Sequence, residues 1–252
     1  MSDAARPVTI KIGGVAGQHA DALVTLARIA PPKTVVVHGG GNEVADWSRR
    51  LGLEPRTHDG LRVTDPATLE VVVAVLGGLV NTRLVAAFES AGRRAVGLTG
   101  ADAGLLRLRR RDPALGEVGE VIGADPTLLA ALGNAGFLPV VSSIGLHEGA
   151  LLNVNADEAA GAIAAARGGL LLLCTDVPGV QRDGHVLERL DPATAEAMLD
   201  DGSASAGMRP KLRAALVTAQ AGCEVRIVDG RSASDLERAL SGDRAGTEVT
   251  AA

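Results

Sequence analysis

Three glycine-rich turns, each placed directly after a run of apolar residues, are the features of this sequence best suited to chemistry. They are Lys11-Ile12-Gly13-Gly14, His38-Gly39-Gly40-Gly41 and Thr99-Gly100. Residues without a Cβ let an anion approach the backbone, and a helix that starts after such a turn offers unbonded N–H groups and a partial positive charge. A single turn of this kind also fits tight strand-to-helix packing. Three of them, with a lysine leading into the first, favour the binding of phosphate or carboxylate groups.

Lysine is scarce in this chain. Of the 25 basic residues, three are lysines, at positions 11, 33 and 211, which leaves 22 arginines (25 minus 3). A compact ammonium on a flexible stem has uses for which a planar guanidinium is no substitute. Lys33 lies in the turn Pro31-Pro32-Lys33 and is interpreted as a chance survivor. Lys11 and Lys211 are therefore candidates for a role in binding or catalysis.

Several familiar site motifs are missing from the sequence. There is no G-x-x-x-x-G-K-[ST], which excludes a P-loop. No G-x-G-x-x-G follows a strand with an acidic residue about 20 positions further on, which weakens a dinucleotide site. The turn His38 to Gly41 is similar to the oxyanion turn of some esterases, but no G-x-S-x-G supplies a nucleophile. His38 is therefore interpreted as a packing residue.

Runs of apolar and β-branched residues alternate along the chain with segments of helical periodicity. The runs lack polar alternation, as is typical of strands covered on both faces. We therefore predict an α/β fold with an open, mainly parallel central sheet and helices on both faces, plus an exposed hairpin from Leu105 to Val121. The predicted strands are Val8–Ile12, Thr34–Val37, Arg94–Leu98, Phe137–Ser143, Leu170–Cys174 and Val225–Val228. The predicted helices are Asp21–Ile29, Asn42–Leu51, Thr68–Ala91, Pro126–Ala135, Ala156–Ala166, Pro192–Asp200, Pro210–Ala221 and Ala233–Leu240.

The composition argues against several classes of protein. The formal net charge is −5 with both signs mixed along the chain, so no basic surface for nucleic acid is expected. The longest uncharged apolar runs, such as Val71–Val80, are shorter than the roughly 20 residues of a membrane helix. The segment Met1–Pro7 is polar and too short for a secretory signal. Cys174 and Cys223 lie in separate apolar runs, as expected of core thiols in the cytoplasm.

Six short motifs occur in an order that resembles one enzyme family. They are Lys11-Ile12-Gly13-Gly14, Val37-His38-Gly39-Gly40-Gly41, Gly60-Leu61-Arg62-Val63-Thr64, Asn153-Val154-Asn155-Ala156-Asp157, Asp176-Val177-Pro178-Gly179 and Gly207-Met208-Arg209-Pro210-Lys211. From about Val8 to about Gly246 the chain resembles the N-acetylglutamate kinases of the amino acid kinase family. The motifs that begin at Gly60 and Asn153 are the specific ones, because the glycine turns are shared across amino acid kinases.

The resemblance implies a role for each matched residue. Lys11 would stabilise the transferring phosphoryl group, Lys211 the charge developing on the leaving β-phosphate, and Asp157 would hold both ammonium groups. From the residues alone, Arg62 also fits a surface ion pair, Asn153 a turn, and Asp157 a helix cap or first-turn acid. The implied acyl-substrate residues are Gly40, Gly41, Arg62 and Asn153. The implied ATP-binding residues are Gly13, Gly14, Asp176, Val177, Pro178, Gly179, Val180, Gln181, Ser203, Ala204 and Ser205.

The implied reaction is phosphorylation of the γ-carboxylate of N-acetyl-L-glutamate by ATP, the second step of arginine biosynthesis. Such a nucleophile is ionised at pH 7, so the chemistry needs positioning and charge neutralisation rather than a base. Mg²⁺ would travel on the phosphates, with no metal site of the protein's own. Residues 1–167 would form an acyl-amino-acid-binding and dimerisation lobe and residues 168–252 a nucleotide-binding lobe, with the boundary near Arg167-Gly168-Gly169.

Other functions stay open from the sequence alone. A related kinase could act on α-aminoadipate or glutamate attached to a carrier protein, with Arg107–Arg111 docking an acidic carrier. A non-catalytic sensor is less favoured, because a pure binding protein has no need of Lys11, Asp157 and Lys211 together. A Rossmann-type oxidoreductase is the alternative if the family resemblance does not hold. The arginine-rich stretch Gly100–Arg111 departs from the family pattern, so the substrate lid is expected to differ in detail. Arginine-inhibited members of the family carry an extra N-terminal helix that interlaces dimers into hexamers. Because seven residues precede Val8, we predict an arginine-insensitive homodimer.

Overall fold

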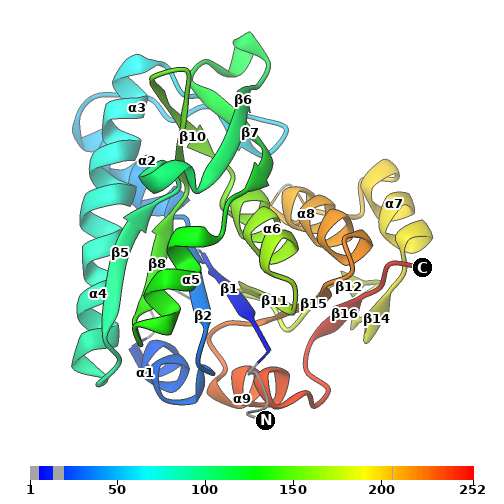
Figure 1. Cartoon of the computed structure of the whole chain (residues 1–252). Coiled ribbons are helices and arrows are strands. Elements are labelled where there is room, and N and C mark those ends of the chain that lie inside the picture. The colour runs from blue at the N-terminus through cyan, green and yellow to red at the C-terminus, as the bar shows by residue number, and fades with distance from the viewer. Residues whose placement is uncertain (1–5, 14–19, 206) are drawn as a thin grey trace.

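An eight-stranded sheet runs through the computed structural model, which describes residues 6–13, 20–205 and 207–252 (Figure 1). The strand order is β14-β16-β15-β11-β1-β2-β8-β5, and every neighbouring pair is parallel except β15 and β16. The bounds are β1 Val8–Ile12, β2 Thr34–His38, β5 Ala95–Thr99, β8 Leu138–Ser142, β11 Leu170–Thr175, β14 Arg189–Leu190, β15 Glu224–Asp229 and β16 Thr247–Val249. The predicted open, mainly parallel sheet is confirmed.

Helices cover both faces of this sheet. One face packs against α1 (Ala20–Ile29), α4 (Asn81–Ser90) and α9 (Ala233–Ser241), and the other against α5 (Thr127–Asn134), α6 (Ala156–Arg167) and α8 (Met208–Gln220). α7 (Pro192–Asp200) lies beside α8, and α2 (Gly41–Arg50) follows β2. Side chains alternate along a strand. Ile10 and Ile12 of β1 therefore point into a first core beside α1, α4 and α9, and Val35 and Val37 of β2 point into a second core beside α5, α6 and α8. Two apolar cores therefore hold the sheet from opposite sides.

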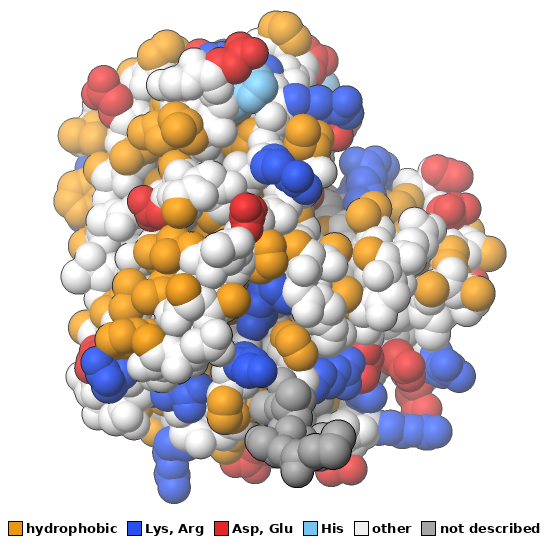
Figure 2. All heavy atoms as spheres, viewed as in Figure 1, with side chains coloured by type: hydrophobic (Ala, Val, Ile, Leu, Met, Phe, Trp, Pro, Cys, Tyr) orange, Lys and Arg blue, Asp and Glu red, His pale blue; other side chains and the backbone are white. Residues whose placement is uncertain are grey.

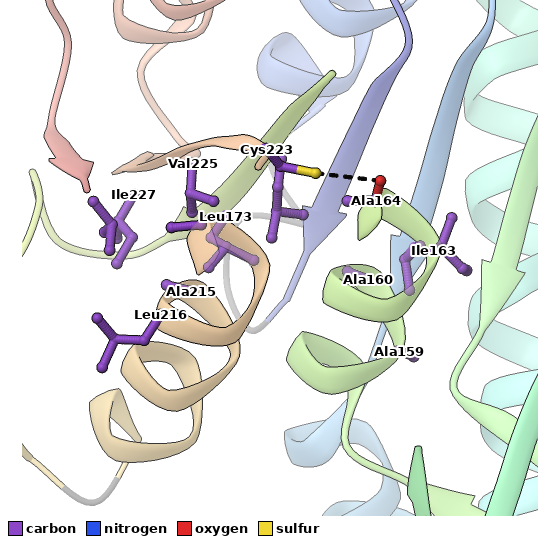
Figure 3. Close-up of a cluster of buried hydrophobic side chains, with 14 of the residues drawn as sticks. Ala159, Ala160, Ile163, Ala164, Leu173, Ala215, Leu216, Cys223, Val225 and Ile227 are labelled. Atoms are coloured by element: carbon purple, nitrogen blue, oxygen red, sulfur yellow. Dashed lines mark hydrogen bonds between the residues drawn. The ribbon is translucent and has the colours of Figure 1, made fainter. Parts of the chain in front are cut away.

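The core around α6 and α8 is built from small residues, which lets the two helices approach closely (Figure 3). A Cβ on Gly161 of α6 would lie 2.6 Å from Oγ1 of Thr218 of α8. Cys223 follows α8, and its Sγ lies 3.4 Å from the carbonyl oxygen of Ala164. This close packing fixes the position of the first turn of α6 relative to the first turn of α8.

A second, four-stranded sheet lies over the carboxyl ends of the central strands (Figure 1). Its order is β6-β7-β10-β9, with β6 Leu106–Arg110, β7 Val118–Ala124, β9 Ile144–His147 and β10 Ala150–Val154. The predicted hairpin from Leu105 to Val121 is formed by β6 and β7. The β9–β10 hairpin was not predicted from the sequence. Two short ribbons complete the strands: β3 Thr57–His58 with β4 Leu61–Arg62, and β12 Gln181–Arg182 with β13 His185–Val186.

The segment predicted as one helix from Thr68 to Ala91 is a continuous helix with a π-helical centre. It consists of α3 (Pro66–Val72), the π-helical η2 (Val73–Val80) and α4, and the Asp65 side chain caps its start by accepting a hydrogen bond from the Thr68 N–H at 2.8 Å. The whole of Pro66–Ser90 is long and apolar enough to span a membrane by length and composition, and 44% of its most apolar window is buried within the chain. Its inner face packs against the second sheet and β8.

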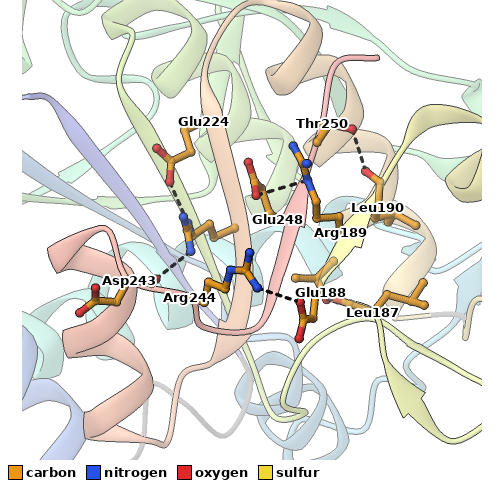
Figure 4. A network of polar contacts seen from close by, with 11 residues as sticks. Leu187, Glu188, Arg189, Leu190, Glu224, Asp243, Arg244, Glu248 and Thr250 are labelled. Atoms are coloured by element: carbon orange, nitrogen blue, oxygen red, sulfur yellow. Dashed lines mark hydrogen bonds and ion pairs between the residues drawn. The ribbon is translucent and has the colours of Figure 1, made fainter.

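Ion pairs line the β14–β16–β15 edge of the central sheet (Figure 4). Arg226 lies 2.7 Å from Glu224 along one strand, and Arg189 lies 3.6 Å from Glu248 across two strands. The Arg189–Glu248 pair is largely exposed and contributes little to stability, whereas Arg226 and Glu224 are 11% and 28% exposed. We infer that these charged side chains keep this edge of the sheet hydrated.

Candidate active site

Lys11 is the penultimate residue of the central strand β1 and lies on the face that packs against α6. Residues 8, 10 and 12 of β1 face the first core, so alternation turns Lys11 to the opposite side. There its Nζ lies 3.1 Å from Oδ1 of Asp157. A Cβ on Gly13 would lie 2.4 Å from the same Nζ, so glycine is needed after the strand for Lys11 to take this position.

Asp157 lies in the first turn of α6. Asn155 caps this helix, its side-chain oxygen accepting hydrogen bonds from the N–H groups of Asp157 and Glu158 at 2.9 and 3.1 Å. An acid in the first turn is stabilised by the positive end of the helix dipole. Asp157 is therefore an acid of the first helical turn and does not cap the helix, because the capping residue is Asn155.

The two lysines singled out by their rarity meet on this one carboxylate. Lys211, in the first turn of α8, donates to Oδ1 of Asp157 at 2.8 Å, and all three residues are buried. Burial alone would raise the pKa of Asp157, but the two ammonium groups outweigh it and hold that pKa well below its usual range. Burial lowers the pKa of Lys11, aided by repulsion from Lys211 and opposed by Asp157. Two cations sharing one carboxylate leave a net charge of +1 in a dry site, which favours an anionic ligand.

A cavity of about 190 Å³ opens beside this triad. Its wall includes Lys11 and Asp157 together with the predicted acyl-substrate residues Gly40, Gly41, Arg62 and Asn153. Residues that were not predicted complete it: Gly39, Val44, Gly60, Leu61, Val72, Leu76, Val118 and Ser143 among them. Gly13, predicted to bind ATP, lines this cavity and not the second cavity described below, which collects most of the other residues predicted to bind ATP. Gly14 lies outside the described residues.

Arg62 reaches the cavity from β4. Its Nη2 donates to the carbonyl oxygen of Gly41 at 2.7 Å, and its Nη1 is buried with no hydrogen-bond partner in the described structure. Burial, with a smaller contribution from Arg49, lowers the pKa of Arg62. A buried guanidinium nitrogen without a partner costs free energy until an acceptor arrives. A carboxylate is the acceptor whose geometry matches the guanidinium fork.

Asn153 lines the same cavity as Arg62. It lies on β10, paired with Val118 of β7, and its Nδ2 lies 3.0 Å from Oγ1 of the buried Thr64. Thr64 belongs to the same five-residue motif as Arg62, so the two specific motifs of the sequence meet in space. Asn153 is part of a strand and not of a turn.

The glycine turn after β2 supplies backbone donors. In the described part of the chain, neither the Gly40 nor the Gly41 N–H donates a hydrogen bond, since α2 begins at Gly41 and its first turn has no carbonyl behind it. A Cβ on Gly40 would lie 2.7 Å from Cδ2 of Leu76, and one on Gly39 would lie 3.3 Å from Cβ of Ala156. The turn is therefore packed closely on both sides while its N–H groups stay available to an anion.

A second cavity of about 220 Å³ lies at the start of α8. It collects most of the residues predicted to bind ATP, namely Val177, Gly179, Val180, Gln181, Ser203, Ala204 and Ser205. Asp176 and Pro178 do not line it, and Met198 and Met208 do although they were not predicted. Met208 lies one helical turn before Lys211, so this largely apolar cavity is connected through α8 to the triad.

Comparisons with known proteins agree with this arrangement. Residues 8–229 match the family model described as the amino acid kinase family. The chain belongs to that family. Curated relatives include the acetylglutamate kinase of Methanopyrus kandleri, 45% identical over 246 residues that cover 92% of this chain and 96% of the relative. The acetylglutamate kinase of Rubrobacter xylanophilus is 42% identical over 249 residues, covering 97% of each chain.

Solved structures of the family share the architecture. The crystal structure of smu.665 from Streptococcus mutans has a TM-score of 0.84 and 29% identity, covering 97% of this chain and 98% of its own. Giardia carbamate kinase has a TM-score of 0.69 and 19% identity, covering 99% and 100%. At that identity the second match supports the fold alone, which agrees with the topology described above.

Proposed function

We propose that this member of the family transfers the γ-phosphoryl group of ATP to the γ-carboxylate of N-acetyl-L-glutamate. The observation that carries the proposal is the triad of Lys11, Asp157 and Lys211. It lies beside a cavity lined by a carboxylate-binding arginine and is joined through α8 to a separate apolar pocket. The relatives of similar length, which are acetylglutamate kinases at 39–45% identity, support the same substrate.

The geometry supports a direct transfer. The γ-carboxylate oxygen attacks the γ-phosphorus, a new O–P bond forms, and the bond from phosphorus to the β–γ bridging oxygen breaks, releasing ADP. Lys11 would stabilise the transferring phosphoryl group and Lys211 the charge left on the β-phosphate, with Asp157 holding both ammonium groups. The Gly40 and Gly41 N–H groups would bind the phosphoryl oxygens or substrate, Arg62 the α-carboxylate and Asn153 the amide. Charge neutralisation of this kind is the main task in phosphoryl transfer.

ATP would place its adenine in the pocket between Val177 and Met208. The described residues contain no group of three or more His, Cys, Asp or Glu side chains suited to a metal ion. We propose that Mg²⁺ enters on the ATP phosphates. The residues that line the acyl cavity all lie between positions 11 and 157, and those that line the nucleotide pocket all lie between positions 177 and 208. This separation along the chain supports two lobes with a boundary between residues 167 and 168.

The arginine-rich hairpin gives little support to the alternative of a carrier-linked substrate. Arg109 is paired with Glu120 at 2.7 Å and Arg110 with Glu117 at 2.7 Å, while Arg111 is paired with Glu158. Three of its four arginines are therefore neutralised within the chain. A basic binding surface for an acidic carrier protein needs arginines that are not already paired within the chain.

We also propose a cytoplasmic homodimer. Both cysteines are unpaired and buried, as suits a reducing compartment. The outward side of the Pro66–Ser90 helix carries the exposed small residues Ala67, Ala74, Gly78 and Ala86. Figure 2 shows hydrophobic side chains gathered on the side of the molecule where Figure 1 places α4 and β5. This face supports the proposed contact between two copies.

The test is ATP-dependent acyl-phosphate formation trapped with hydroxylamine, with N-acetyl-L-glutamate compared with free glutamate, aspartate and α-aminoadipate. A signal confined to N-acetyl-L-glutamate and absent without ATP supports the proposal. A comparable signal with a free amino acid overturns the substrate assignment. Silence on all four, from protein that still binds ATP, makes the carrier-linked substrate the working hypothesis.

A further inference from the structure

A buried histidine holds the glycine turn at the end of β2. His38 is 1% exposed, and its Nδ1 lies 2.9 Å from the carbonyl oxygen of Gly39. Its other ring nitrogen, Nε2, lies 3.0 Å from Nδ2 of the buried Asn81. His38 does not line the acyl cavity, so it touches the site only through the backbone of the turn.

Asn81 determines which ring nitrogen carries the proton. Its Nδ2 also lies 2.9 Å from the carbonyl oxygen of Val140 and 3.2 Å from that of Leu98. Carbonyl oxygens only accept, so the atom that faces them must be the amide NH₂ group, and it donates. An amide NH₂ group cannot accept a hydrogen bond, so the His38 Nε2 that faces it is unprotonated and shares the two Asn81 N–H groups with the two carbonyl oxygens. In the neutral ring the single proton is on Nδ1, which donates to the Gly39 oxygen.

The ring is neutral at physiological pH. Burial lowers the pKa of His38 to about 4, although the hydrogen bond to Gly39 and the charge of Glu43 act in the other direction. Lys11 lowers the pKa further. Asn81 thus determines the tautomer of the neutral ring, and at pH 7 the doubly protonated ring is not populated to a significant extent.

The bond to Gly39 orients the next N–H. The peptide group between Gly39 and Gly40 is trans and planar, so its C=O and N–H point in opposite directions. We propose that His38 is a positioning residue for phosphoryl transfer: by holding the Gly39 oxygen behind the turn, it aims the Gly40 N–H into the acyl cavity. This inference rests on the proposed function, since it gives that N–H a reacting phosphoryl group to meet.

The placement of Asn81 depends on the π-helical segment. From Leu76 onward the buried residues of this helix are Leu76, Asn81, Leu84 and Phe88, a spacing of five followed by three and four. In a regular α-helix the residue below Leu76 would be residue 80, and the wider turn of η2 brings Asn81 inward instead. Gly97 of β5 makes room for it, because a Cβ there would lie 2.0 Å from Asn81 Oδ1.

Three variants separate positioning from packing. His38→Asn keeps an N–H donor close to the place of Nδ1, whereas His38→Gln places its amide close to Nε2 and leaves the Gly39 oxygen without a donor. Leu84→Ala, on the neighbouring core, is the control for loss of packing. We expect His38→Gln to lower kcat by tenfold or more with little change in either KM, as for loss of a donor acting in the transition state (on the order of 10²–10³ for a complete loss). His38→Asn should recover most of that loss.

An NMR measurement tests the tautomer independently of any substrate. Ring ¹⁵N shifts should show Nδ1 protonated and Nε2 unprotonated at pH 7. Protonation of Nε2 alone overturns the inference, and so does a kcat for His38→Gln equal to that of His38→Asn in folded protein. If wild-type protein is inactive on N-acetyl-L-glutamate, the proposed function fails, while the tautomer result still decides whether His38 holds the turn.

Discussion

Lys211 Nζ lies 2.8 Å from Oδ1 of Asp157, and the two side chains are only 6% and 10% exposed. The same oxygen lies 3.1 Å from Lys11. A single carboxylate thus offsets two buried ammonium groups that come from opposite ends of the chain. Loss of any one of the three charges therefore changes the balance between the other two.

Asp157→Asn is expected to destabilise the protein and to inactivate it. Removing the shared anion leaves two buried cations facing each other, a change that costs about 3–5 kcal/mol in unfolding free energy. Misplaced lysines should lower kcat by about 10²–10³. Denaturant unfolding and steady-state kinetics measure the two effects. The matched control is Asp46→Asn, which removes the exposed pair with Arg49 and should change neither; a loss for Asp157→Asn no larger than the control's contradicts the assignment.

Gly13→Ala is expected to lower kcat because it moves Lys11. The new Cβ would lie 2.4 Å from Lys11 Nζ, so the ammonium has to shift from its position beside Asp157. Lys11→Arg should be no more active than Lys11→Met, since the space next to residue 13 does not admit a planar guanidinium. We expect a fall in kcat of about tenfold or more for Gly13→Ala. Wild-type turnover in either Gly13→Ala or Lys11→Arg would argue against the role of Lys11.

Arg62→Ala is expected to raise the KM for the acyl substrate and to change kcat little. Its unpartnered Nη1 is placed to bind a substrate carboxylate in the ground state and transition state alike, and loss of such uniform binding appears in KM. A charge-assisted hydrogen bond contributes about 1.5–3 kcal/mol, or roughly 10- to 150-fold in KM. Arg50→Ala, which removes an exposed arginine stacked on Trp47, is the control. A rise in the KM for ATP alone would contradict the assignment.

Ser205→Trp is expected to raise the KM for ATP selectively. Ser205 is an exposed residue on the wall of the second cavity, so an indole there should fill space that we assign to the adenine. Binding of N-acetyl-L-glutamate, measured by calorimetry without nucleotide, should stay within about twofold of wild type because additivity holds for separate sites. An unchanged KM for ATP would place the adenine elsewhere.

His38 should make the stability of the protein depend on pH. Its pKa is about 4 when folded and 6.5 ordinarily, so between these values the unfolded chain binds a proton that the folded protein does not. Stability therefore falls as pH is lowered from 6.5 to 4, by about 3 kcal/mol, and this contribution is constant below pH 4. Denaturant unfolding at pH 7 and 4.5 should show a smaller loss for His38→Asn than for wild type. His58→Asn, at an exposed site, should behave like wild type.

Much of the central architecture can be predicted from local sequence. Apolar runs without alternation, such as Leu170–Cys174, indicate strands buried on both faces, and the eight-stranded sheet contains all six of those predicted. The scarcity of lysine leaves three candidates, and the turn around Lys33 reduces them to Lys11 and Lys211. What local sequence does not contain is that both meet Asp157, which requires β1, α6 and α8 to pack together.

The residues missed by sequence reasoning depend on distant partners. The β9–β10 hairpin, which supplies Ser143 at its edge, is held in place by pairing with β7. Asn81 reads as an ordinary polar residue in a helix, and only the π-helical turn directs it inward. The role inferred for His38 then depends on which amide atom Asn81 presents. The five-residue gap between the buried positions Leu76 and Asn81 is visible only in the structure, because the apolar Leu79 and Val80 lie between them in the sequence.

The central position of β1 determines when its two neighbouring strands become available during synthesis of the chain. Val8 pairs with Thr34 on one side but with Leu170 on the other, 162 positions later (170 minus 8). At about 5–20 residues per second, β1 leaves the ribosome roughly 8–32 s before its second partner exists. During that interval the edge of β1 that later pairs with β11 is open, and Lys11 lies apart from its later partner Lys211. The nascent chain is therefore most exposed to aggregation, and most in need of a chaperone, before residue 170 has emerged.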